Sequence, residues 1–199
     1  MFLDAEGGVL GLPDGRSAQA FDAKLGSLNE LLQKIADMKA AIAKGEKGLE
    51  KKLFFLELDL GRFDLKALQA KAKSLKGLTD AQQARLAADI LDLQMKEVFN
   101  LVRQEDGLAM AGKILMEIHA TGVFPTGRNE GPFWGYSMEY AESVENVAMF
   151  EAAFTEIERM FGDNERMAPM LAEKRASLKK MKSGDEPEEE IVEEVVEGK

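Results

Sequence analysis

The chain has 199 residues, of which 45% are hydrophobic and 31% charged, a composition that allows a globular protein and excludes wholesale disorder. The chain has no cysteine and one histidine, which excludes disulfides, thiolate nucleophiles and any metal site built from several histidines of one chain. The net charge of −10 argues against nucleic-acid binding, and no apolar run approaches the roughly 18 residues of a membrane span, so no membrane insertion is expected.

The first predicted elements are an N-terminal arm and a long helix. Residues 1–16 are apolar and glycine-rich, with a β-turn pattern at 12–15, and they predict an arm rather than a helix. Ser17 can cap a helix that extends to about Lys44, because apolar residues there recur at alternating steps of four and three. This spacing is typical of a coiled coil.

A second helical pattern follows over 49–76, after a break at 45–48 whose length suits an antiparallel hairpin. Leu56, Leu58 and Leu60 also alternate as in a strand, so 53–60 has two interpretations. The helical spacing explains more of the segment. The sequence therefore predicts a long helical hairpin over 17–76.

Residues 79–182 predict a helical bundle. Thr79 and Gln82 have the spacing of a capping box at the start of a helix that reaches at least Gln104. The pair at 106–107 either ends or kinks this helix before a further helical stripe up to His119.

The second half of the bundle follows a long irregular stretch. Ser137 is predicted to cap a helix that runs to Phe161, with Gly162 as its stop, and a last helix covers about 168–182. The fold class predicted is thus all-α, an elongated bundle of five to six helices within a helical domain over 17–182.

Residues 183–199 predict a disordered acidic tail, since they hold eight acidic residues and one lysine. Four aliphatic residues of this tail lie at spacings of one and four, which would form one apolar stripe in a helix. This stripe predicts a segment that folds on a partner protein. The predicted partner-binding residues are Ile191, Val192, Val195 and Val196.

The stretch from His119 to Tyr140 holds the only histidine, the only tryptophan and both tyrosines. Its glycines and prolines predict an ordered aromatic loop over 120–136 between two helical halves. Two roles are open for it: a plug that completes the core, or a binding site in which Arg128 meets a carboxylate or phosphate. The candidate binding residues are His119, Phe124, Arg128, Glu130, Phe133, Trp134, Tyr136 and Tyr140.

Catalytic templates fit this stretch poorly. The segment 122–129 resembles the spacing of a phosphate-binding loop, but Arg128 and Asn129 replace the required lysine and hydroxyl residue. Ser137 and Ser143 follow His119 without a nucleophile-elbow motif. We therefore predict no catalytic residues, no metal and no cofactor.

The predicted function is that of a non-enzymatic, cytoplasmic protein that interacts with a protein partner or with itself, as a structural accessory subunit of a larger assembly. The coiled-coil spacing, the apolar arm and the striped tail motivate this prediction. The alternative is a small-ligand-binding protein or enzyme with its site in the 119–140 loop.

Overall fold

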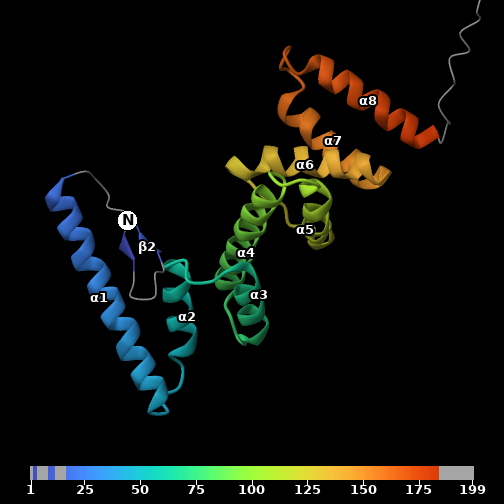
Figure 1. The fold of residues 1–199 in the computed structure, drawn as a ribbon. Coiled ribbons are helices and arrows are strands. Elements are labelled where there is room, and N and C mark those ends of the chain that lie inside the picture. The colour runs from blue at the N-terminus through green and yellow to red at the C-terminus, as the bar shows by residue number, and fades with distance from the viewer. Residues whose placement is uncertain (1, 4–8, 12–16, 184–199) are drawn as a thin grey trace, which may run out of the picture. The chain divides into compact units, whose positions relative to one another are not determined.

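The computed structural model describes residues 2–3, 9–11 and 17–183 (Figure 1). These residues form eight α-helices, one 3-10 helix and one pair of short strands. The helical fold class is confirmed, but eight helices replace the predicted five to six. The chain divides into two compact units, Met1–Ile90 and Leu91–Lys199. This division falls inside helix α4, Asp80–Leu101, whereas the predicted division between hairpin and bundle lies at 77–78.

The N-terminal arm contains the two strands. Strand β1, Phe2–Leu3, pairs antiparallel with β2, Val9–Gly11, and Phe2 is opposite Gly11. The predicted turn at 12–15 lies outside the described residues.

The helical hairpin of unit 1 begins with α1, Ala18–Ala43, and continues with α2, Glu50–Asp59, which lies beside it (Figure 1). Ser17 caps α1 as predicted, because its side chain accepts a hydrogen bond of 3.1 Å from the backbone N–H of Ala20. The hairpin encloses a small core of Leu28, Ile35 and Leu60. The strand interpretation of 53–60 is wrong, since α2 covers most of that segment.

The single helix predicted over 49–76 is also wrong, because the structure breaks it into α2 and α3, Leu65–Ser74. Gly61 has a φ of 64°, a left-handed conformation that ends a helix and favours glycine. Asp64 then starts α3 by accepting a 2.7 Å hydrogen bond from the N–H of Ala67. These local signals interrupt the hydrophobic spacing that suggested one continuous helix.

Helix α4 begins with the predicted capping box. The N–H of Thr79 donates to Gln82 Oε1 at 3.0 Å, and the N–H of Gln82 donates to Thr79 Oγ1 at 3.3 Å. The helix ends at Leu101, short of the predicted Gln104, and after Asp106, whose φ of 56° is left-handed, α5 covers Gly107–Thr121. The predicted break near 106–107 therefore ends one helix, and Gly107 begins the next.

The predicted loop over 120–136 is largely helical, which corrects the sequence interpretation. After Gly122, irregular backbone extends only over 123–126 before the 3-10 helix η1, Gly127–Asn129, and α6, Glu130–Ser143. Pro132 lies in the first turn of α6, where the chain needs no N–H donor and a proline fits. Glycine and proline thus mark the start of a helix here.

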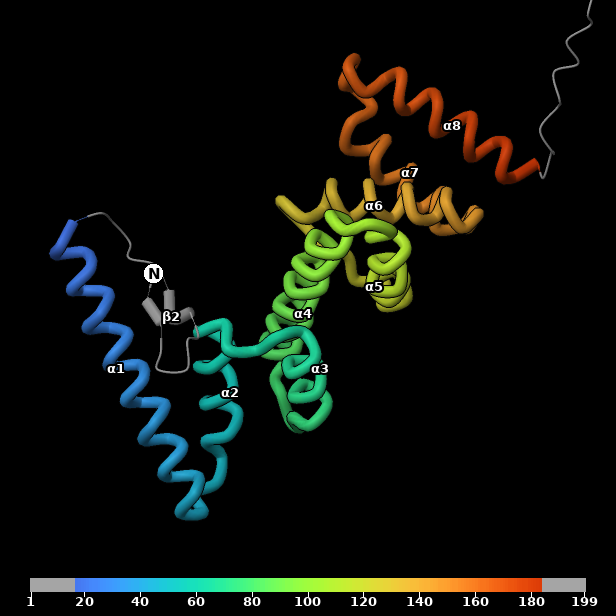
Figure 2. Tube along the Cα trace, viewed as in Figure 1, coloured from blue at the N-terminus to red at the C-terminus, as the bar shows by residue number. Residues whose placement is uncertain are grey.

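The predicted start of the helix over 137–161 is also wrong. Ser137 lies in the middle of α6, and α7, Val147–Phe161, begins separately at Asn146, whose side chain accepts a 3.1 Å hydrogen bond from the N–H of Met149. Helix α8, Ala168–Ser183, matches the predicted last helix. Figure 2 traces the turns between α6 and α7 and between α7 and α8.

The core of unit 2 is formed by buried side chains of α4 to α8, with α6 and α7 in the most extensive contact. Three ion pairs join α8 to the helices before it, namely Glu142 with Lys174, Glu158 with Arg175 and Glu151 with Lys182. The predicted tail from 184 onward, including Ile191, Val192, Val195 and Val196, lies outside the described residues. The largest fully buried apolar side chains of this core are Met95, Val98, Leu115, Ile118, Phe133 and Phe150.

Candidate functional site

Four of the predicted site residues form one cluster of rings. Trp134 lies 4.7 Å from Phe124 and 4.8 Å from Phe133 between ring centroids, and the His119 ring is 5.3 to 5.5 Å from all three. The end of α5 supplies His119, the connection supplies Phe124, and the first turns of α6 supply the other two. Tilted and edge-on pairs at these distances stabilise a core.

The cluster is largely closed to solvent. Phe133 is fully buried and Trp134 is 5% exposed, while Phe124 and His119 are half-buried. Phe133 and Trp134 belong to the core of unit 2. The rings thus fill the space between α5 and α6 with their own side chains.

His119 is held in its neutral form by this environment. Burial lowers its pKa, because charged imidazolium loses hydration among the rings. Its Nε2 atom is buried and has no hydrogen-bond partner among the residues that the structure describes. A neutral imidazole packed in this way serves as a ring of the core.

Ser137 does not complete a catalytic pair with His119. The hydroxyl of Ser137 is fully buried in α6 and, like His119 Nε2, finds no hydrogen-bond partner within the described part of the chain. A serine nucleophile needs a hydrogen bond to its base and an open approach for substrate. Ser143 instead donates to the backbone oxygen of Tyr140 at 2.7 Å.

The polar residues at the start of α6 make structural contacts. Asn129 Nδ2 donates to Asp92 Oδ1 at 3.0 Å and ties η1 to α4. Glu130 forms an ion pair with Arg159 of α7. Asn129 is 9% exposed, and no local sequence pattern predicts this role, because its partner is 37 residues away.

Tyr136 and Tyr140 lie outside the four-ring cluster. Tyr136 meets Phe99 edge-on at 6.2 Å. Tyr140 donates from its hydroxyl to Met116 Sδ at 3.6 Å, and its ring packs against the backbone of Gly112. Arg128 is exposed. The predicted site residues therefore divide into a buried cluster of four rings, two separate tyrosines, a glutamate paired with Arg159 and a solvent-facing arginine.

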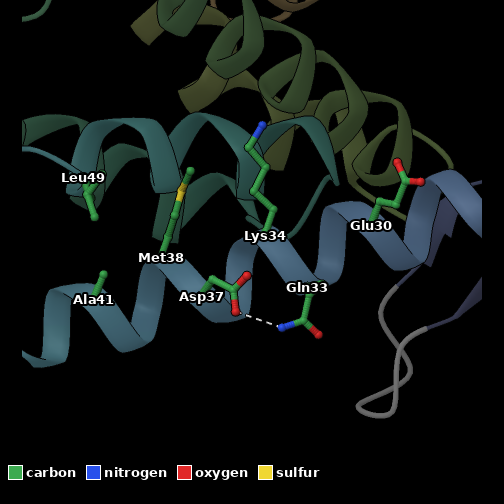
Figure 3. A pocket seen from close by; sticks show the side chains of 7 residues that line it. All are labelled: Glu30, Gln33, Lys34, Asp37, Met38, Ala41 and Leu49. Carbon is green, nitrogen blue, oxygen red and sulfur yellow. Dashed lines mark hydrogen bonds between the residues drawn. The ribbon is translucent and has the colours of Figure 1, made fainter.

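Grooves lie on the described surface of unit 1, and none of the residues 119–140 lines them. One of about 510 Å³ lies along the hairpin and is called the α1 groove. Met38, Ala41 and Leu49 form its apolar part, and charged and polar side chains of α1 border it (Figure 3). These bordering residues are Glu30, Gln33, Lys34 and Asp37.

A second groove of about 510 Å³ lies between α2 and the start of α4. Arg85 borders it with its guanidinium 5.4 Å from the Phe55 ring centroid, and it forms an ion pair with Asp59. The hydrogen bond to Asp59 raises the pKa of Arg85. The charges of Arg85 and Asp59 are thus paired with each other within the unit.

Comparisons with protein families, curated proteins and solved structures found no match to this chain. No helix within the described ranges is long and apolar enough to cross a membrane. In the same part of the chain, no three histidine, aspartate or glutamate side chains are grouped as a metal site requires. Functional inference therefore rests on the surfaces of the molecule.

Proposed function

We propose that this chain is a non-enzymatic interaction protein that associates with a second copy of itself through the α1 groove and so serves as a structural subunit of an assembly. The observation that carries the proposal is this groove, in which half-buried Ala41 and Leu49 keep apolar surface in contact with solvent beside side chains of both charge signs.

Helix α1 has 26 residues, yet only Leu28, Ile35 and Met38 are buried. A hairpin of two helices leaves part of each apolar stripe uncovered, and helical hairpins commonly reach a four-helix core by pairing. The coiled-coil spacing of α1 fits such pairing. Leu49 lies across from Ala41 in the groove, so a further helix would find apolar contacts there (Figure 3).

The border of the α1 groove favours a second copy as its occupant. Glu30, Lys34 and Asp37 follow one another along α1 at steps of four and three, and Asp37 accepts a 2.8 Å hydrogen bond from Gln33 Nε2. Two copies that meet antiparallel about a two-fold axis between Lys34 and Asp37 are complementary in charge. Lys34 of each copy then faces Asp37 of the other.

The alternative function, ligand binding in 119–140, has less support. Most of the aromatic side chains proposed for it contact one another or the core, and the grooves described above lie elsewhere. Arg128 is the remaining exposed feature of that proposal.

The test uses charge segregation at the groove border. Lys34→Glu makes the border wholly acidic, and the double variant Glu30→Lys with Asp37→Lys makes it wholly basic. Each is expected to be monomeric alone, because like charges would face each other, whereas an equimolar mixture should form mixed dimers. Sedimentation velocity on wild type, each variant and the mixture measures this directly.

Lys113→Glu, an exposed change on α5, is the control and should associate like wild type. Circular dichroism of every variant separates a loss of association from a loss of folding. A monomeric wild type at all concentrations, or variants that still self-associate, would contradict the proposal.

A further inference from the structure

A third groove of unit 1 lies where the end of α3 meets the first half of α4. It has a volume of about 430 Å³ and is called the α3–α4 groove. Leu86 at its floor is buried, whereas Leu75, Leu78 and Ile90 are half-buried and keep apolar surface in contact with water. Covering such surface is favourable. The apolar lining residues are Ala72, Leu75, Leu78, Leu86, Ala87 and Ile90.

Lysines flank this apolar surface. Lys71 and Lys73 stand on either side of the lining residue Ala72, and Lys76 lies between Leu75 and Gly77, which also line the groove. All three lysines are exposed. The segment 65–79 contains four lysines and no acidic residue, and within the described residues none of these lysines forms an ion pair.

The sequence of residues 184–199 has the complementary chemistry. It contains eight acidic residues and one lysine. Its aliphatic residues, Ile191, Val192, Val195 and Val196, recur at the spacing that places them on one side of a helix. An acidic segment with one aliphatic stripe is the kind of ligand that an apolar groove flanked by unpaired lysines binds.

We propose that the α3–α4 groove binds residues 184–199 of a second copy of this chain. The aliphatic side chains enter the groove, and the neighbouring glutamates face Lys71, Lys73 and Lys76. This proposal needs a second copy of the chain, so it rests on the self-association proposed above. The α3–α4 groove and its ligand are separate from the α1 groove. Each assembly of two copies would then contain two such contacts.

The test uses the full chain with a photo-crosslinking amino acid in place of Glu194, next to the aliphatic stripe. Isotopically light and heavy copies are mixed before irradiation, and cross-linked peptides are identified by mass spectrometry. We expect products that join 184–199 to 72–90 and combine a light with a heavy peptide, which marks a contact between copies.

The groove variant is Lys71→Glu, Lys73→Glu and Lys76→Glu together. The yield of these products should fall about tenfold, as for the loss of several exposed ion pairs. The matched control is Lys47→Glu, Lys96→Glu and Lys113→Glu, which changes the net charge equally at other exposed positions and should leave the yield unchanged.

A change in the acidic segment alone keeps the test decisive if the groove variant folds poorly. Glu189→Lys, Glu190→Lys and Glu193→Lys should abolish the products in the wild-type background, and in a folded groove variant the same changes should restore them. Raising the salt concentration should lower the wild-type yield.

Cross-links that fall outside 72–90, products formed within single copies only, or a yield indifferent to the lysine changes would each overturn the inference. The two proposals fail separately. A wild type that is monomeric by sedimentation refutes self-association, whereas a dimer without cross-links from 184–199 to 72–90 refutes only the binding of the acidic segment.

Discussion

The ring of Tyr140 lies directly against the backbone of Gly112, so close that a Cβ atom on residue 112 would be 2.0 Å from Tyr140 Cε2. This contact joins α5 to α6 without an intervening side chain. Gly112 is buried in the middle of α5, where alanine would ordinarily be the better helix former. Close packing here outweighs helix propensity.

Gly112→Ala is therefore expected to lower the free energy of unfolding by about 1 to 3 kcal/mol, the usual cost of overpacking. The measurement is urea denaturation followed by circular dichroism. Gly135→Ala is the matched control, since a Cβ there meets nothing within 4 Å, and it should stabilise the protein by up to about 1 kcal/mol. Equal effects of the two changes would contradict the packing argument, and Tyr140→Ala should remove most of the cost at residue 112.

Because His119 is partly buried, the stability of the protein should depend on pH. Its folded-state pKa lies below the ordinary 6.5 because burial disfavours the imidazolium. The unfolded chain therefore binds more protons as pH falls below about 6.5, and the free energy of unfolding should decrease, by at most about 1.4 kcal/mol per pH unit for one group. Above that pH the contribution is constant.

His119→Phe tests this assignment, since the chain has no other histidine. Phenylalanine keeps a ring in the cluster and does not titrate, so the loss of stability between pH 7 and pH 5 should shrink. Denaturation curves at both pH values give the comparison. An unchanged pH dependence would assign the effect to other groups.

Asn129 and Arg128 are neighbours in sequence, but alanine substitutions at the two positions should change the stability of the protein by different amounts. Asn129→Ala removes the hydrogen bond to Asp92 and should cost about 1 to 2 kcal/mol, because the buried side chain ties η1 to α4. Arg128→Ala changes an exposed side chain and should alter stability by less than about 0.5 kcal/mol. Thermal denaturation of both variants shows whether the larger loss belongs to Asn129.

The ion pair between Glu142 and Lys174 links α6 to α8 at 2.5 Å. Burial would raise the pKa of Glu142, but hydrogen bonds from Lys174 and Ser177 together with the charge of Lys174 lower it. A lowered carboxyl pKa gives stability that is present above the ordinary value of 4.5 and is lost as pH falls toward the folded-state value.

Lys174→Met should thus lower stability by about 1 kcal/mol at pH 7 and reduce the loss seen on acidification below pH 4.5. The variant keeps the apolar stem, so packing of α8 is largely preserved. Urea titrations at pH 7 and pH 3.5 distinguish the charge effect from a packing effect, which would be the same at both.

Local signals in the sequence determined the helical class and several helix ends. The capping box at Thr79 and Gln82, the cap at Ser17 and the last helix near 168–182 follow from contacts between residues close in the chain. Such contacts depend on local geometry and can be inferred without the rest of the fold.

Other features were decided by tertiary structure. The hydrophobic spacing over 49–76 does not show the break at Gly61, and the glycines and proline near 131–135 suggested a loop where packing of Phe133 and Trp134 stabilises a helix. Contacts such as Gly112 with Tyr140 and Asn129 with Asp92 join residues 28 and 37 positions apart. Only the folded arrangement brings these side chains together, and burial then sets which are core and which remain on the surface.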